Sequence, residues 1–471
     1  MRSSPLLPAL LLGACAGEPE FEAHGCDPTA QSGDGVSYEP EDMACVQVSM
    51  DDGELEELMD QFRFAGGVDD QWPGIIAATA MSCSEPYPDG YTYFSADVSV
   101  DGWETSNVGI RKKGFIGSVI GAGSRPSLKV KTDEFVDHQT LGDTERITLN
   151  NNLQDLTRFR TCLTYSVFAD ADYPAPLCNL ANVSVNDQPL GAYTHVESPK
   201  KRFLRRNFGN DDGSLYEGTL ADFTDAHLAG LPDTLGRWEA KTSDTDPSGT
   251  GLLRVTKALQ AGDDDLEYAL GNAIDLDAFM QFWALETLVN HVDGYGANTN
   301  NFFVYFDPDR GGLGVFIPWG ADDTFAGWEP NKVTAELTRR LSRHPELHQR
   351  YLDELQILLD EVWDEDVLDA RIDAFTEQVE SAEPSSEQRR DDVRGIRSWV
   401  AKRRKNVQRF IDGGGELGNP QTGACTGNVD PDDFLLLAEV ATVASATCST
   451  APSSGVGALI ALFILGLRRM R

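Results

Sequence analysis

The segment that most constrains this chain is a predicted hairpin with polar residues at both of its open ends. Apolar strands are predicted over 302–306 and 313–319, with a Pro- and Gly-rich turn between them. Because a hairpin lays its first residues beside its last ones, we expect Asn298 to Asn301 to meet Asp322 and Asp323. Carboxylate and amide oxygens that converge in this way suit Mg²⁺ or Mn²⁺, which complete their shell with water and substrate phosphate.

The order of polar residues along this segment is typical of protein kinases. His291 and Asp293 form a His-x-Asp string, Asn298 follows five residues after that Asp, and Asp322 comes after the hairpin. In this interpretation Asp293 accepts or orients the proton of the substrate hydroxyl. Asn298 and Asp322, with Asp323 beside them, hold the metal on the nucleotide phosphates. The alternative stays open, because short strings of this kind arise by chance and Asp and Asn are ordinary turn residues.

Four basic residues of the first part are candidates for contacting phosphate. No Walker-type GxxxxGK[ST], DFG or VAIK motif is present. The stretch 127–131 alternates apolar and basic residues, so Lys129 and Lys131 lie on one face of a predicted strand. Arg111 and Lys113, just before a Gly-rich stretch, are further candidates. Each of them alone has the alternative of a solvated surface charge.

Strand patterns dominate the first part of the body and helical patterns the second. A helix is predicted over 159–171, and a hairpin is predicted with strands 181–185 and 192–196. A second helix begins after Asp275, and residues 334 to 411 read as nearly continuous helix. This order predicts an α+β body with two lobes, a strand-rich N-terminal one and a helical C-terminal one.

The N-terminus has the layout of an export signal. Arg2 precedes the apolar run 6–12, and Gly13-Ala14-Cys15 follows. A Leu three positions before such a Cys is the pattern of a lipoprotein signal, in which the thiol is lipidated. We therefore expect a signal peptide over 1–14 and a flexible linker over 15–44. The alternative is an ordinary cleaved signal with an incidental Cys.

The C-terminus carries a second targeting pattern. After a linker predicted over 413–450, the apolar run 455–467 is shorter than the ~20 residues that span a bilayer. Cys448, this run and the basic end 468–471 together resemble MYXO-CTERM sorting tails, so 451–471 is expected to be a sorting or anchoring tail. A terminal helix packed on the body is the alternative. Both ends predict a cell-envelope location outside the cytoplasm, with membrane attachment.

The remaining cysteines and the charge agree with export. Without Cys15 and Cys448, the chain has six cysteines: Cys26, Cys45, Cys83, Cys162, Cys178 and Cys425. An even number in an exported chain indicates disulfides, and the short separation of Cys162 and Cys178 makes them the first candidate pair. The net charge of −37 argues against nucleic acid as a partner.

Seven segments in family order resemble the CotH family, secreted atypical kinases named for spore coat protein H. They are GIRKKG at 109, SLKVK at 127, LNNNLQDLTRFR at 149, VNDQPLGAYTHVE at 185, KKRFLRRNFGNDDGSLYEG at 200, NHVDGYGANTNNFFVY at 290 and IPWGADDTF at 317. The resemblance implies a divergent two-lobed protein-kinase-like fold over 45–412. It also implies binding of ATP with Mg²⁺ or Mn²⁺, and phosphorylation of secreted or surface proteins, with the chain acting as a monomer.

By motif, the resemblance makes Asp293 the catalytic-loop Asp, Asn298 its metal-binding neighbour and Lys129 the Lys of the nucleotide lobe. Asp322 matches the second Asp of the family's Trp-Asp-x-Asp motif, but Gly320 stands where the first Asp is expected. This departure keeps a second function open, a catalytically weak, kinase-like surface protein that serves as an adhesin or envelope-assembly factor.

Overall fold

The computed structural model describes residues 35–64, 82–119, 123, 125–327 and 333–417. Several predicted features lie outside these residues: the signal peptide 1–14, most of the linkers 15–44 and 413–450, the tail 451–471, and Cys15, Cys26, Cys425 and Cys448. Among the described residues no helix is long and apolar enough to cross a membrane.

Seven strands of the first part close into a barrel, in the order β1-β2-β3-β4-β5-β7-β6. They are β1 Ala44–Ser49, β2 Phe94–Val100, β3 Trp103–Lys112, β4 Leu128–Lys131, β5 Arg146–Asn150, β6 Cys178–Val185 and β7 Gln188–Val196. All neighbours are antiparallel except β1 and β6, whose parallel pairing closes the barrel. Closure leaves no free strand edge.

The barrel interior follows from alternation along the strands. In β4, Leu128 and Val130 are buried while Lys129 and Lys131 remain half-buried, so the predicted strand is confirmed. The predicted hairpin is confirmed as β6 and β7, joined by two residues of positive φ that suit such a turn. Tyr38 stacks on His195 with ring centroids 4.3 Å apart, so the described end of the predicted linker packs on the barrel.

The described residues of the first part also form the helices α1 Asp52–Asp60, α3 Ile116–Val119 and α4 Arg160–Asp170, and α5 Lys201–Phe208 follows β7 and packs on β8, β10 and β11. Helix α4 corresponds to the helix predicted over 159–171. A disulfide between Cys162 and Cys178 ties α4 to β6, which confirms the predicted pair. Cys45 and Cys83 are also disulfide-bonded.

A four-stranded sheet of order β11-β10-β8-β9 forms the second part together with helices. Its strands are β8 Ser214–Gly218, β9 Trp238–Ala240, β10 Phe302–Asp307 and β11 Leu313–Pro318. The helices are α6 Thr250–Leu259, α7 Asp263–Gly271, α8 Leu276–Val289, α9 Tyr295–Asn298, α10 Glu336–Leu341, α11 Pro345–Glu361, α12 Glu365–Ala382 and α13 Glu387–Asp412, with a short 3-10 turn at Pro308–Arg310. The α+β class is confirmed.

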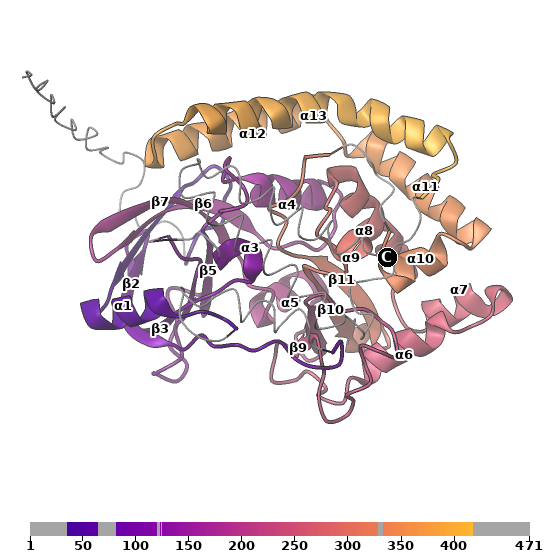
Figure 1. Cartoon of the computed structure of the whole chain (residues 1–471), viewed down its shortest axis with the longest axis horizontal. Helices are drawn as coiled ribbons and strands as arrows, with labels where there is room; N and C mark the ends of the chain where they lie inside the picture. The colour runs from indigo at the N-terminus through magenta and orange to yellow at the C-terminus, as the bar shows by residue number, and fades with distance from the viewer. Residues whose placement is uncertain (1–34, 65–81, 120–122, 124, 328–332, 418–471) are drawn as a thin grey trace, which may run out of the picture.

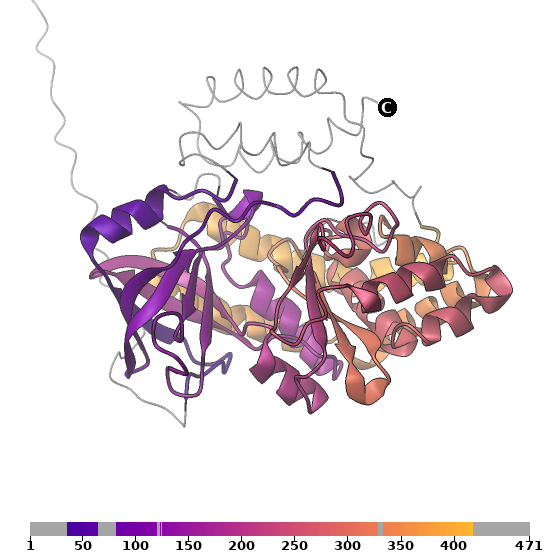
Figure 2. The ribbon, with the colours of Figure 1, turned by 90° about the horizontal axis from the view of Figure 1, so that it is seen from below.

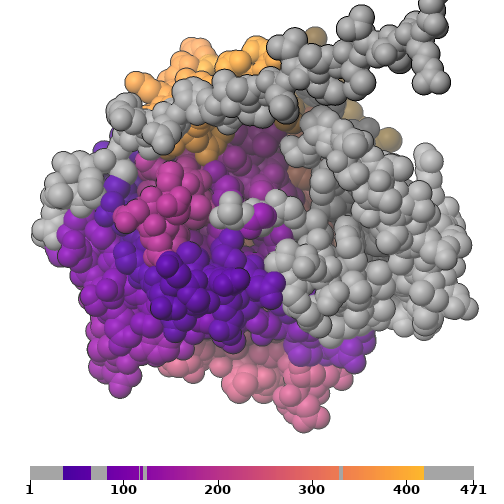
Figure 3. Space-filling model, turned by 60° about the vertical axis from the view of Figure 1, so that its left-hand side comes forward, coloured from indigo at the N-terminus to yellow at the C-terminus, as the bar shows by residue number. Residues whose placement is uncertain are grey.

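The barrel lies at one end of the long axis and the helices α6, α7, α10 and α11 at the other (Figures 1 and 2). Helices α12 and α13 run along one side of both, and α12 contacts β6 and β7 while α13 packs on α11. In the space-filling view the orange surface of these two helices lies at the top of the molecule and meets magenta and purple surface below it (Figure 3).

Helix α8 is the centre of the helical part because nearly every one of its side chains is buried. As predicted, Asp275 caps its start, and its Oδ1 accepts a 3.1 Å hydrogen bond from the Ala278 amide. The fully buried Arg403 of α13 donates to the carbonyl oxygens of Leu288, at 2.8 Å, and Thr287. This arginine fixes the end of α8, from which the candidate site begins.

Candidate active site at the open end of the β10–β11 hairpin

The register of β10 and β11 brings the two polar ends of the hairpin together. Phe302 pairs with Pro318, and beyond that pair the Trp319 amide donates a 3.1 Å hydrogen bond to the Asn301 carbonyl. Asp322 and Asp323 follow directly, and both carboxylates interact electrostatically with Asp293. The structure therefore places the two predicted groups of polar residues at one end of the hairpin.

Asp293 is held by the side chains of three asparagines that follow it. Its Oδ1 accepts a 2.5 Å hydrogen bond from Asn298 Nδ2. Its Oδ2 accepts bonds from Asn300 Nδ2 at 3.1 Å and from Asn301 Nδ2 at 2.7 Å. Burial raises the pKa of Asp293, although the Asn298 hydrogen bond opposes the shift. Because Asn298 uses its nitrogen here, its Oδ1 remains as the oxygen that can serve a metal.

Glu286 fixes the loop that carries Asp293, and the sequence did not single it out. Its buried carboxylate accepts hydrogen bonds from the amides of Tyr295, at 2.8 Å, and Gly296, at 2.9 Å. The approach is so close that a Cβ on Gly294 would lie 2.2 Å from Glu286 Oε1. The sequence does contain a signal for it, because Glu286 is an acidic residue inside the apolar run of α8. A carboxylate buried in a helix needs a hydrogen-bonding partner.

His291 lies behind the loop. Helix α8 ends at Val289, two residues before it, and Asn290 follows in the left-handed conformation at φ 55°. The buried His291 has its Nε2 3.3 Å from the Gly320 carbonyl oxygen and its Nδ1 3.6 Å from Glu286 Oε1. Burial alone would lower the pKa of this imidazole, but Glu286 raises it overall.

Within the acidic group, Asp322 has a strongly raised pKa. Burial, followed by the charges of Asp293 and Asp323, raises its pKa to about 7. Neighbouring carboxylates raise each other's pKa values, and a cation bound between them would favour their charged forms. Within the described residues no group of three His, Cys, Asp or Glu side chains could hold a metal. Asp293 and Asp322 with the Asn298 oxygen fit Mg²⁺ all the same, since this ion needs one or two carboxylates and takes its other ligands from water and phosphate.

The basic residues predicted to contact phosphate differ in how close they lie to the acidic group. Lys113 is closest to the acidic group: burial lowers its pKa to about 8, and Glu217 and Asp322 oppose the shift. It contacts Asn150 Oδ1 and lies 6.0 Å from the centroid of the Trp319 ring. Arg111 instead forms a 2.9 Å ion pair with Asp89.

Lys129 belongs to a cluster that the sequence did not predict. Burial lowers its pKa to about 7, and the charges of Lys241 and Lys200 add to the effect. Lys241 forms ion pairs with Glu217 and, at 3.2 Å, with Glu239. Lys200 donates to the Lys241 carbonyl, and burial lowers its pKa to about 7 as well. Three lysines around one half-buried glutamate, Glu217, suit the phosphates of a nucleotide.

The family model described as CotH kinase protein matches residues 114–412, which is more than half of the chain. The chain belongs to the CotH kinase family. No curated protein matches the chain. The part of the chain that matches the CotH kinase model contains Lys129, Asp293, Asn298, Asp322 and Asp323, while Arg111 and Lys113 lie just before it.

Proposed function

We propose that this CotH kinase family protein transfers the γ-phosphoryl group of ATP to a Ser, Thr or Tyr hydroxyl of a secreted or envelope protein. The observation that carries the proposal is the position of Lys113, which interacts electrostatically both with Asp322 of the carboxylate pair and with Glu217 of the Lys129 cluster. One side of this site is acidic and suited to a metal, and the other is basic and suited to phosphate. The barrel and the sheet-and-helix part would then be the two lobes of a kinase-like fold.

Each residue has a role that its surroundings support. The Asp293 carboxylate, held by three asparagines, accepts the proton of the acceptor hydroxyl as the oxygen bonds to the γ-phosphorus. The bond between that phosphorus and the β–γ bridging oxygen breaks, and ADP leaves. Lys129 and Lys113 bind phosphate oxygens. Asn298 and Asp322, with Asp323 beside them, would hold the divalent ion, which neutralises charge on the phosphates.

The raised pKa of Asp293 suits a general base, because a base works best when its pKa approaches the working pH. The sequence patterns at both termini add the proposal that the chain works outside the cytoplasm, attached to the cell envelope. Its partner would then be a protein of the same compartment.

Thermal unfolding of the purified chain with ATP and Mg²⁺ tests the nucleotide site. At a hundredfold excess over Kd, binding stabilises the folded state by about 2.7 kcal/mol, a gain that Asp322→Asn should abolish. Asp264→Asn, at an exposed position on α7, is the matched control and should keep the full gain. Transfer of label from γ-labelled ATP to dephosphorylated casein, lost in Asp293→Asn, tests the reaction itself.

One observation favours a second function. Gly320 stands where the family motif has its first Asp. Asp322 is therefore the one acidic residue of that motif left to bind a metal. If neither stabilisation by nucleotide nor transfer of label is found, a surface protein with an adhesive or assembly role accounts better for the chain.

A further inference from the structure

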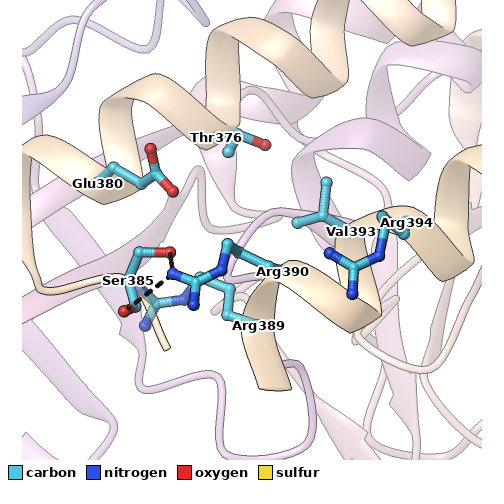
Figure 4. Close-up of a pocket in the computed structure, with 7 residues that line it drawn as sticks. All are labelled: Thr376, Glu380, Ser385, Arg389, Arg390, Val393 and Arg394. Atoms are coloured by element: carbon cyan, nitrogen blue, oxygen red, sulfur yellow. Dashed lines mark hydrogen bonds between the residues drawn. The ribbon is translucent and has the colours of Figure 1, made fainter. Parts of the chain in front are cut away.

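A cavity lies beside the turn that joins α12 to α13 and belongs to no part of the candidate active site. It has a volume of about 190 Å³. Its lining includes Thr376, Glu380, Ser385, Arg389, Arg390 and Arg394 (Figure 4). A water molecule takes up about 30 Å³ of liquid, so the space accommodates several waters or one tetrahedral anion.

The arginines of this cavity differ in how they are held. Arg389 is buried, pairs with Glu383, and donates to the Leu156 carbonyl at 3.1 Å. Arg394 is exposed, and its ion pair among the described residues is with its helix neighbour Asp391, a surface contact of small energy. Arg390 forms no ion pair within the described residues. Its Nη1 lies 3.3 Å from Ser385 Oγ and 3.5 Å from the Ser385 carbonyl (Figure 4).

Arginines gather around the turn, although the whole chain has a net charge of −37. Arg125 and Arg158 join Arg389 on Glu383, at 2.8 and 3.0 Å from its carboxylate oxygens. With Arg390 and Arg394 there are five arginines. Between 380 and 394 there are also five acidic residues, Glu380, Glu383, Glu387, Asp391 and Asp392, and Glu380 lines the cavity and opposes an anion. Among the described residues Glu383 pairs with Arg125, Arg158 and Arg389, so Arg390 and Arg394 are the arginines available to an anion.

We propose that Ser385 is a phosphorylation site whose phosphate is held by Arg390 and Arg394. Ser385 is half-buried at the cavity, with its hydroxyl already at Arg390. The neighbouring Ser386 is a poorer acceptor because its Oγ caps α13, accepting a 3.0 Å hydrogen bond from the Arg389 amide. A phosphate on Ser385 carries nearly two negative charges and three acceptor oxygens, which suit the guanidinium forks.

The modification takes its phosphoryl group from a nucleoside triphosphate. The Ser385 oxygen bonds to the γ-phosphorus, the β–γ bridging bond breaks, the nucleoside diphosphate leaves and the hydroxyl proton is released. The proposal does not rest on the kinase activity proposed above, because the phosphate can be installed during synthesis of the chain.

The position links the modification to the barrel. Glu383, two residues before Ser385, also accepts a 3.2 Å hydrogen bond from the Ala192 amide of β7. A phosphate beside this carboxylate would attract the same arginines that join the α12–α13 turn to the barrel.

The test is a ³¹P NMR titration of the full chain with phosphoserine installed at position 385. A free phosphoserine has a second pKa of about 6, and we expect a value at least one pH unit lower in this cavity. Arg390→Ala with Arg394→Ala should return it toward 6. Phosphoserine installed at the exposed Ser243, beside Asp244, is the control and should not titrate below 6. A value near 6 at position 385, insensitive to the arginine changes, would overturn the proposal.

Occupancy is tested separately by mass spectrometry of the chain purified from the cells that make it. We expect phosphate on Ser385 rather than on Ser386. A chain that is unmodified at Ser385 in every growth phase would also overturn the proposal.

Discussion

The side chain of Asn301 fills the space beside Gly320 that any larger residue would need. A Cβ atom on Gly320 would lie 2.5 Å from Asn301 Oδ1 and 2.6 Å from its Cγ. Gly320 also has a φ of 51°, a conformation that glycine adopts without strain. The same Asn301 donates a 2.7 Å hydrogen bond to Asp293. Asn301 therefore links the Gly320 position to the hydrogen bonding of Asp293. An Asp at position 320 would collide with Asn301 and disturb Asp293.

Gly320→Asp should destabilise the chain instead of restoring a stronger metal site. A strained backbone conformation costs about 1–3 kcal/mol, and the collision with Asn301 adds to it. Urea unfolding at pH 7 measures the change in the free energy of unfolding. The double variant with Asn301→Ala should lose less stability than the sum of the single variants. Full additivity would contradict the coupling between the two positions.

Mg²⁺ should stabilise the chain more at pH 8 than at pH 6. Because the pKa of Asp322 is raised to about 7, the metal-free folded state binds more protons than the unfolded state between about pH 4 and 7. Its stability therefore falls as the pH rises through that window. Metal must displace the proton, so its apparent affinity should weaken by about tenfold per pH unit below 7.

Calorimetric Mg²⁺ titrations at several pH values, with nucleotide present, measure this dependence. Asp322→Asn should remove it, and the metal-free variant should be more stable than the wild-type chain at pH 8. Asp264→Asn on α7 should leave the pH profile unchanged. A wild-type profile that is flat between pH 6 and 8 would contradict the assignment of Asp322.

Glu286→Gln should loosen the loop of Asp293. The change replaces one carboxylate oxygen by an NH₂ group that faces the amide of Tyr295 or Gly296. Hydrogen bonds to charged groups are worth about 1.5–3 kcal/mol, so we expect a loss of that order in unfolding free energy, with lower activity. Glu377→Gln, at an exposed position on α12, is the matched control and should change neither. Equal effects of the two changes would argue against the positioning role.

Lys129→Met should weaken nucleotide binding by about tenfold to a hundredfold, the equivalent of one charged hydrogen bond. The stability of the nucleotide-free chain should not decrease, because burial and neighbouring lysines disfavour the charge of Lys129. Lys131→Met is the control on the same strand face, where the lysine pairs with Glu134 at 2.7 Å. Fluorescent-nucleotide titrations compare the two, and equal losses would remove Lys129 from the site.

The double change Cys162→Ala with Cys178→Ala should lower the unfolding free energy by about 3 kcal/mol, because the bond closes a loop of 16 residues. Substitution is preferable to reduction, since Cys45 and Cys83 are disulfide-bonded too. Urea unfolding of both chains under oxidising conditions measures the difference. An unchanged midpoint would mean that packing of α4 on β6 suffices.

Local patterns predicted the elements whose reasons are local. The alternation at 127–131, the cap at Asp275 and the hairpin of β10 and β11 each follow from neighbours in the sequence, and all are present. The pairing of Cys162 with Cys178 was predictable because the separation is short. Closure of the strands into a barrel was not, since it depends on which distant strand β1 meets.

The residues of the candidate site also divide into those with a local sequence signal and those without one. Asp293, Asn298 and Asp322 were found because one hairpin brings them together. Glu286 was missed because its partners are backbone amides, which leave no signature in side-chain chemistry. The cluster around Lys129 joins β4, β8 and the segments beside α5 and β9, and single-sequence patterns do not encode such contacts.

The parallel pairing of β1 with β6 has a consequence for how the chain is made. Val46 pairs with Val183, so the first strand to be synthesised finds its second neighbour only after almost all of the barrel sequence has followed. Until then β2 covers one edge of β1 and the other edge stays open, and such an edge can recruit strands from neighbouring chains. A cell that produces the protein must therefore keep the open edge of β1 from pairing with other chains until β6 has been synthesised.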